Sequence, residues 1–381
     1  MNPAWMCVGA GAALSFLGIH TIDLGMSTDP AAAELADDAR RQLAFLAVAA
    51  AAGVGAAIPH PRLIMRLALP AMGAAIVLLL FLLMPGVPSS IVRPINGARA
   101  WISVGPARLQ PSELAKIAFV LVVARHLRFR AEHRRFAGLL PPALIAFVPI
   151  GLIMLQPDLG TVLLFIPALF AMLVAAGARL RHLTLIVLIA ALAAPAAYPL
   201  LRPHQQARIN ALIGQIQGER EGERSINYQS VTARKLMGAG GVTGNTDTHS
   251  RALLRYNPLP ARHNDMIFAV AVTRFGLLGG VGILLLYVTW IAGALACAAM
   301  CKEPFGRLVI VGLSAFIAAQ VVVNVGMNVG LLPIIGVTLP FLSAGGSSLL
   351  TVWIMTGLVF GVAMRRPIPP YRPSFEYADD A

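Results

Sequence analysis

Charged side chains are scarce in this sequence. Asp, Glu, Lys and Arg make up only 12% of the 381 residues, whereas 57% are hydrophobic. A mean hydropathy of +0.75 is too apolar for one or two soluble domains of this length. Uncharged apolar runs of roughly 20 residues, long enough to cross a bilayer as helices, recur from the start of the chain nearly to its end. The sequence therefore predicts an integral membrane protein.

Metal-binding and nucleotide-binding signatures are also lacking. Cys7, Cys297 and Cys301 fall in apolar segments, and no histidine or further thiol completes a metal site around them. The glycine-rich stretch 238–244 has no Lys-Ser or Lys-Thr after it, so we expect a flexible turn near the reaction site rather than a phosphate loop. No basic helix is interleaved with aromatics, which argues against nucleic acid as a partner. Residues 1–16 lack a basic region and a cleavage site, so they predict a first span rather than a removable signal.

Hydropathy divides the chain into about ten apolar segments of helical length. The expected spans are 4–25, 42–58, 64–84, 112–127, 139–155, 159–177, 183–201, 265–295, 308–330 and 345–364. The predicted fold class is all-α, with a polytopic transmembrane domain over residues 1–364. A large extracytoplasmic loop, 202–264, connects the seventh and eighth helices. The tail 365–381 is rich in proline and polar groups, and we expect it to be cytoplasmic and disordered.

Basic residues set the expected orientation. The formal net charge of +13 comes from 30 Lys and Arg against 17 Asp and Glu. The cations cluster in alternate short loops, at Arg62 and Arg66, Arg125 through Arg135, Arg179 and Arg181, Lys302 and Arg307, and Arg365 and Arg366. Under the positive-inside rule these loops, and both termini, lie in the cytoplasm.

Two connections on the opposite side carry cations that this rule does not explain. Loop 85–111 holds Arg93, Arg99 and Arg108, and the stretch 202–264 holds nine Lys or Arg. A long loop can be translocated whatever its charge, and this accounts for the larger stretch without a ligand. For the shorter loop, an anionic partner is the better explanation.

Ionisable residues near the outer face are candidates for chemistry, because a charge in hydrocarbon is costly without a partner or a polar cavity. Glu113 and Lys116 stand three apart at the start of the fourth span, on one helical face and close enough to pair. Either they form a structural ion pair, or Lys116 faces a phosphate. Asp158, in LQPDLGT, is placed to cap the sixth span, and capping alone explains it.

Asp265 differs from these residues. It follows the loop ARHND and opens the eighth span, beside Arg262 and His263. Capping of the helix is again one interpretation. The functional interpretation is a general base, because an acceptor hydroxyl needs a positioned carboxylate to remove its proton while a new bond forms.

Four blocks in this sequence are similar to signature blocks of one family. They are NGARAWISVGPARLQPSELAK (96–116), LQPDLGT (155–161), HNDMIFAV (263–270) and GLLPIIGVTLPFLSAGGSSLL (330–350). Their order, their spacing and the ten-span hydropathy resemble the SEDS family, the RodA/FtsW/SpoVE group, over nearly the whole chain. The resemblance implies a bacterial inner-membrane glycosyltransferase that polymerises lipid II beside a class B penicillin-binding protein.

The same resemblance implies roles for individual residues. Asp265 matches the family's catalytic aspartate and would activate the C4 hydroxyl of the acceptor's N-acetylglucosamine. The attack falls on the anomeric carbon of the donor's N-acetylmuramic acid, and undecaprenyl pyrophosphate leaves. Lys116, Arg99 or Arg108 would stabilise its growing charge; a divalent cation is an option that no ligand set here demands. The expected substrate-binding residues are Trp101, Arg99, Arg108, Glu113, Lys116, Asp158, His263, Ser343, Ser347 and Ser348.

The chain departs from the family pattern at several places. Thr273 and Arg274 stand where an acidic pair is expected, Ala344 replaces a usual tyrosine, and Asn245 replaces a common lysine. The sequence HND, 263–265, replaces His-Thr-Asp. These differences predict a divergent member of the family.

The last block, 330–350, has two interpretations. Its prolines and glycines would let the outer ends of the last two spans bend and approach closely. Alternatively, Ser343, Ser347 and Ser348 donate hydrogen bonds into the substrate cavity.

Two other functions remain open at this point. A lipid II flippase would need a polar path from the cytoplasmic side, and Arg274, about 13 Å deeper than Asp265 at 1.5 Å per residue, favours it. A catalytically silent scaffold would only recruit or activate a penicillin-binding protein.

Overall fold

The computed structural model describes most of the chain. The described residues are 2–27, 35–88, 90–92, 98–105, 107–128, 135–200, 206–207, 209–210, 213–214 and 228–365. The predicted disordered tail lies outside them from residue 366 onward, as does most of the first half of the predicted large loop.

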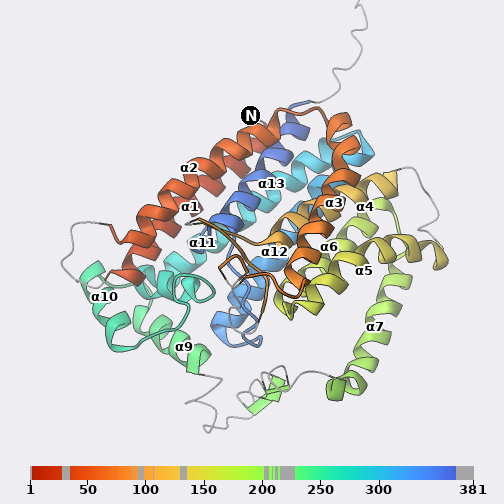
Figure 1. Cartoon of the computed structure of the whole chain (residues 1–381). Helices are drawn as coiled ribbons and strands as arrows, with labels where there is room; N and C mark the ends of the chain where they lie inside the picture. Colours follow the sequence, from red (N-terminus) through yellow and green to blue (C-terminus); the bar gives the residue numbers. More distant parts are fainter. Residues whose placement is uncertain are drawn as a thin grey trace, which may run out of the picture.

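A helix lies at each of the ten segments where hydropathy predicts a span (Figure 1). These helices are α1 (Ala4–Met26), α2 (Asp37–Ala57), α3 (Pro61–Leu83), α4 (Pro111–Arg128), α5 (Leu140–Leu155), α6 (Leu159–Ala176), α7 (Leu180–Ala197), α11 (Ile267–Met300), α12 (Pro304–Val329) and α13 (Gly346–Met364). The chain is therefore mostly helical, as its composition predicts.

Seven helices within the described residues are long and apolar enough to cross a membrane: α1, α3, α5 with the turn before it, α6, α11, α12 and α13. The apolar part of α7 is shorter, at Leu180–Ala193. The helix α2 begins with four charged residues in five positions, and α4 carries charges at both ends. The chain is an integral membrane protein, and the number of ten crossings stays a prediction.

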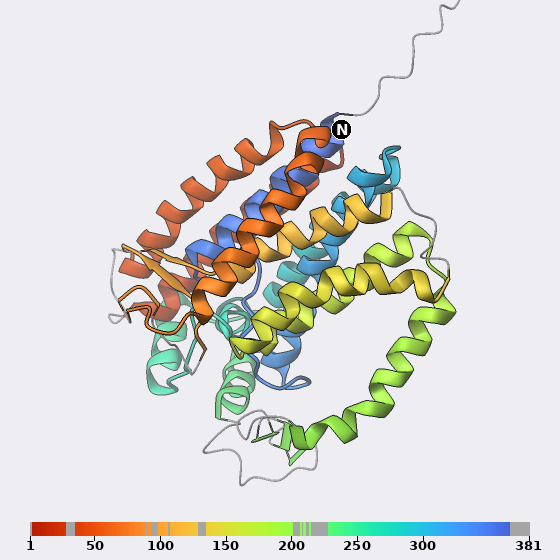
Figure 2. The same ribbon diagram turned by 45° about the vertical axis from the view of Figure 1, so that its right-hand side comes forward.

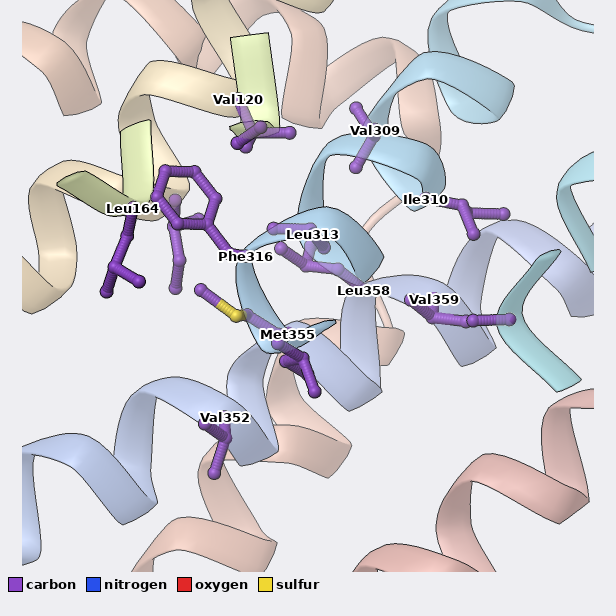
Figure 3. Packing of buried hydrophobic residues seen from close by; sticks show 14 of the residues in the cluster. Val120, Leu164, Val309, Ile310, Leu313, Phe316, Val352, Met355, Leu358 and Val359 are labelled. Atoms are coloured by element: carbon purple, nitrogen blue, oxygen red, sulfur yellow. The ribbon is translucent and has the colours of Figure 1, made fainter. Parts of the chain in front are cut away.

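The helix α12 forms the centre of the bundle, in contact with α4, α6, α11 and α13. Apolar side chains from α4, α6, α12 and α13 meet there (Figure 3). Phe316 of α12 packs edge-on against Phe165 and Phe119, with ring centroids 5.2 and 6.0 Å away. This core holds the outer ends of the helices in fixed positions relative to one another.

Small residues let α2 and α13 approach closely. A Cβ at Gly357 would collide with the carbonyl oxygen of Gly53, and one at Gly361 would meet the backbone of Ala57. Close contact between helix backbones is a common way to pack helices in a membrane. The contact fixes the start of α2 beside the segment that precedes α13. In contrast, α7 lies at the edge of the bundle in both views, with most of its side chains exposed (Figures 1 and 2).

The predicted large loop contains two helices, α9 (Tyr228–Gly240) and α10 (Asp247–Tyr256). The turn between them fits into a kink of α11 at Gly276, where φ is +68°. Leu277 and Leu278 donate backbone hydrogen bonds to Gly241 and Val242, at 2.9 and 3.1 Å. The glycine-rich turn is thus anchored to a helix and does not line the cavity described below, which corrects the expectation of a flexible turn near the reaction site.

One short element departs from the predicted all-α class. Strands β1 (Ile102–Val104) and β2 (Ala107–Leu109) form an antiparallel hairpin between α3 and α4, with Ser103 opposite Arg108. The hairpin carries Trp101 at its start. It lies at the same end of the bundle as the beginnings of α2, α4 and α6.

Candidate active site

A cavity of about 550 Å³ opens at the end of the bundle where α2, α4, α6 and α13 begin. The turn before α11 and the segment 335–348 complete its walls. Eight of the predicted site residues line it: Trp101, Arg108, Glu113, Asp158, His263, Asp265, Ser347 and Ser348. Four blocks that lie far apart in the sequence therefore meet at one cavity. Arg99, Lys116 and Ser343 are outside the lining.

Asp265 lies in the turn that leads into α11. The N-cap position of that helix is Met266 and the first helical residue is Ile267. Asp265 therefore does not occupy the capping position that the sequence offered as one interpretation. Its carboxylate lines the cavity, and a Cβ built on Gly336 would lie 3.7 Å from its Oδ2 atom. The glycine thus leaves the space beside the carboxylate free of a side chain.

Ser343 ties the turn before α11 to the segment before α13. Its hydroxyl donates to the backbone oxygen of Asn264 at 2.7 Å and accepts from the backbone N–H of Leu339, also at 2.7 Å. The backbone N–H of Ala344 donates to the oxygen of His263 at 2.8 Å. Ser343 is buried, and its hydroxyl is occupied by the backbone. The prediction that it donates into the cavity is therefore wrong.

Ser347 and Ser348 do line the cavity. The hydroxyl of Ser347 accepts a hydrogen bond from the backbone N–H of Gln110 at 3.1 Å. The hydroxyl of Ser348 is 3.2 Å from that of Thr338, and either one can be the donor. These hydroxyls both bridge wall segments and present polar atoms to the cavity.

Glu113 and Lys116 form a buried ion pair, with Lys116 Nζ 2.8 Å from Glu113 Oε1. Glu113 lines the cavity, whereas Lys116 lies behind it. The structural pair proposed from the sequence is confirmed, and the alternative in which Lys116 faces a phosphate is wrong. Within the described residues, the Oε2 atom of Glu113 has no hydrogen-bond partner.

Asp158 caps α6, as predicted. Its carboxylate accepts from the backbone N–H of Thr161 at 3.1 Å and from its hydroxyl at 2.8 Å. Gln110 Nε2 also donates to Asp158, at 3.2 Å. The carboxylate thereby connects the hairpin segment to α6 while it remains part of the cavity lining.

Two arginines line the cavity, Arg41 from α2 and Arg108 from β2. Arg41 belongs to α2 and forms a loose, exposed ion pair with Asp38 at 3.9 Å. Asp38, Arg41 and Gln42 were not predicted as site residues. Asp38 and Arg41 precede the expected second span, and Gln42 is its first residue. The signal was the polar run at residues 37–42, which forms the first turns of α2.

His263 also lines the cavity, and its side chain is half-buried. Burial lowers its pKa below the ordinary 6.5; the charge of Arg262 lowers it further, and the charge of Asp38 opposes both effects. The imidazole is therefore neutral near pH 7, with one ring nitrogen that donates a hydrogen bond and one that accepts.

Neither residue of the divergent pair Thr273–Arg274 faces the cavity. Thr273 is buried and donates to the backbone oxygen of Ala269 in its own helix. Arg274 forms an ion pair with Asp247 of α10 and donates to the backbone oxygen of Asn245. The Arg274 side chain is thus directed to the α9–α10 region, so it supplies no charge to a polar path below Asp265. This removes the sequence feature that favoured a flippase.

A metal site does not emerge from the described part of the chain. No group of three or more His, Cys, Asp or Glu side chains comes together there in a way that could hold an ion. Asp38, Glu113, Asp158 and Asp265 share the cavity lining without forming such a cluster.

Comparisons with known proteins agree with this architecture. The profile of the FtsW/RodA/SpoVE family, described as cell cycle protein, matches residues 2–367. The chain is 34% identical over 290 residues to stage V sporulation protein E of Bacillus subtilis, which covers 75% of this chain and 76% of that protein. It is 33% identical over 282 residues to the peptidoglycan glycosyltransferase MrdB of Escherichia coli K12, covering 71% and 72%.

A solved structure is similar as well. One chain of a peptidoglycan synthase complex that coordinates polymerization and crosslinking superposes with a TM-score of 0.77 at 30% identity. The match covers 94% of this chain and 97% of that one.

Proposed function

The chain belongs to the SEDS family, the FtsW/RodA/SpoVE family of cell cycle proteins, and on that premise we propose that it is a glycosyltransferase that polymerises lipid II into peptidoglycan. Relatives named peptidoglycan glycosyltransferase support the reaction class. The observation that carries the proposal is the carboxylate of Asp265 in a cavity of about 550 Å³ whose walls also present guanidinium groups. A base and anion-stabilising cations in one cavity are what transfer of a sugar from a pyrophosphate requires.

In the proposed mechanism, Asp265 is the general base. The C4 oxygen of the acceptor's N-acetylglucosamine bonds to the anomeric carbon of the donor's N-acetylmuramic acid while its proton passes to the carboxylate. The bond between that carbon and the pyrophosphate oxygen breaks, and its electron pair leaves with undecaprenyl pyrophosphate. Arg41 and Arg108 would stabilise the charge that develops on the leaving group. Lys116 takes no part, because its ammonium group is buried in an ion pair with Glu113.

Other lining residues would bind and orient the two sugars. Glu113 and Asp158 offer acceptor oxygens for hydroxyl or amide hydrogens, and Ser347 and Ser348 offer hydroxyls from the facing wall. Trp101, at the start of the hairpin, presents an aromatic face of the kind that packs on sugar rings. Correct orientation alone can lower the activation free energy by several kcal/mol, about 7 in favourable cases.

The proposed location is the bacterial inner membrane with the cavity on the outer side. The start of α1 and the end of α13 lie at the end of the bundle away from α9 and α10 (Figure 1). Arg62, Arg66, Arg125 and Arg365 lie at that same end, which the positive-inside rule assigns to the cytoplasm. The proposed partner is a class B penicillin-binding protein, which would cross-link the strands. Similarity to a chain of a peptidoglycan synthase complex supports this assembly.

The test is polymerisation of labelled lipid II by the purified full-length protein, alone and with its partner. Wild type should yield glycan strands, and Asp265→Ala should lower the rate by about 10²- to 10⁴-fold, the usual contribution of a general base. Unchanged expression and elution of the variant would exclude misfolding. Polymer from Asp265→Ala at the wild-type rate would overturn the assignment of the base. Translocation of lipid II without polymer would indicate a flippase. If this chain made no polymer but raised the activity of its partner, it would be a scaffold.

A further inference from the structure

The central helix α12 carries a row of buried amide side chains. Gln320, Asn324 and Asn328 are spaced four residues apart, so they lie on one face of the helix. Their exposed fractions are 1%, 0% and 0%. A buried amide in an apolar helix is costly unless its donors and acceptors are used. Among the described residues the Oε1 atom of Gln320 has no hydrogen-bond partner, whereas both asparagines are bonded. The partners of Asn324 and Asn328 therefore indicate the role of these two residues.

Both asparagines donate to one atom. The Nδ2 atoms of Asn324 and Asn328 each lie 2.9 Å from the backbone oxygen of Asp265. A carbonyl oxygen has two lone pairs, so these two bonds saturate it. Asp265 lies in the turn that precedes the helix. The two amides fix the backbone of this residue, which lines the cavity.

The same amides extend to the neighbouring segments. Asn328 Oδ1 accepts the backbone N–H of Ala269 at 3.1 Å, which fixes the first turn of α11. Asn324 Nδ2 also donates to the backbone oxygen of Val337 at 2.7 Å. Val337 follows Gly336, where an added Cβ would lie 3.7 Å from Asp265 Oδ2. The pair thus holds the backbone of Asp265 and the segment beside its carboxylate against a single helix.

We infer that Asn324 and Asn328 are positioning residues, which fix the Asp265 carboxylate relative to the wall at Gly336; this inference rests on the proposed role of Asp265 as the base. A general base must lie within hydrogen-bond reach of the proton that it removes, and small displacements are expensive. An error of about 1 Å in a reacting group can lower the rate about 10²-fold. Substrate contacts made by other walls do not depend on these two amides.

The test separates kcat from substrate affinity in purified full-length protein with lipid II. Asn324→Leu and Asn328→Leu remove the donors while keeping the branched shape of the side chain, and the Leu/Leu double variant removes both. We expect each single variant to lower kcat about 10-fold and the double variant about 10²-fold, with the Kd for lipid II changed less than about threefold. Ser314→Ala is the matched control, because Ser314 is buried on the same helix and only donates to Ile310 of its own turn.

A second pair of variants avoids the extra volume of leucine. Asn324→Ala and Asn328→Ala remove the amide without adding atoms, so kcat should fall even where leucine does not fit. If the Leu variants do not fold, the Ala variants decide. Wild-type kcat in folded Ala or Leu variants would overturn the inference, as would a parallel loss of kcat and affinity. An inactive wild type would instead contradict the proposed function, and the two failures are thereby distinct.

Discussion

Lys116 Nζ lies 2.8 Å from Glu113 Oε1, with the two side chains only 1% and 5% exposed. Removing one member of a buried pair leaves an uncompensated charge, which costs about 3–5 kcal/mol. We predict that Lys116→Met lowers the melting temperature strongly, and that Lys116→Met combined with Glu113→Gln regains much of the loss. Thermal unfolding in detergent measures both.

The matched control is an ion pair that water reaches. Glu303 lies 3.3 Å from Arg128, with side chains 33% and 24% exposed. Exposed pairs contribute about 0–1 kcal/mol, so Glu303→Gln should change the melting temperature little. A Lys116→Met variant as stable as wild type would contradict the prediction, because the pair would then be solvated.

His263 makes stability depend on pH in a predictable direction. Burial lowers its pKa below 6.5, so the unfolded chain takes up a proton on acidification before the folded protein does. The contribution of this residue to stability is therefore complete above about pH 6.5 and is lost as the pH falls through the lower pKa of the folded state. We predict that His263→Gln flattens the fall in melting temperature as the pH decreases below about 6.5.

Melting curves at several pH values test this prediction. An identical pH slope in wild type and His263→Gln would contradict it.

The two guanidinium groups at the cavity should affect catalysis rather than stability. If Arg41 and Arg108 stabilise the departing pyrophosphate, Arg41→Ala and Arg108→Ala should each lower kcat/KM about tenfold, equivalent to about 1.4 kcal/mol. High salt should diminish the difference, because both groups are exposed and screened. Initial rates of polymerisation at two ionic strengths measure this.

Arg181→Ala removes an exposed cation from the beginning of α7, far in sequence from the lining residues, and serves as the control. Equal rates for Arg41→Ala, Arg108→Ala and the control would mean that the leaving group is stabilised elsewhere.

The sequence predicted the helices well because each apolar run has the length and uniformity of a membrane helix. It also predicted the ion pair at Glu113 and the cap at Asp158, since both depend on spacing within one helix. The directions of side chains between helices were less accessible. Ser343 is turned away from the cavity because its hydroxyl bonds to the backbone of Asn264 and Leu339, and the contact with Asn264, 79 residues away, leaves no local pattern.

Other residues were missed for an identifiable reason. Arg41 precedes the apolar run of α2, so hydropathy assigned it to a loop although the helix begins at Asp37. Asn324 and Asn328 showed a polar pair four apart within an apolar span, a signal that was present but not used. Their common partner, the carbonyl of Asp265, is 59 and 63 residues away. A local sequence motif cannot connect residues that are so far apart in the chain, so this contact could not be predicted.

Gly336 offers the sharpest test of the space around the proposed base. A Cβ there would lie 3.7 Å from Asp265 Oδ2, in ordinary van der Waals contact, where an acceptor hydroxyl would otherwise approach. We predict that Gly336→Ala lowers kcat about tenfold or more, because a displaced hydroxyl loses its alignment with the carboxylate. Gly336 has φ of +78°, so the alanine also introduces backbone strain.

Gly86→Ala separates these two effects. Gly86 has a similar φ of +87°, but a Cβ there would meet nothing within 4 Å. Both alanine variants should therefore lose a similar amount of stability, about 1 kcal/mol for a non-glycine residue in this region. Only Gly336→Ala should lose polymerisation, since only its methyl group lies beside the carboxylate. Equal activity of the two variants would mean that the acceptor reaches Asp265 from another side of the cavity.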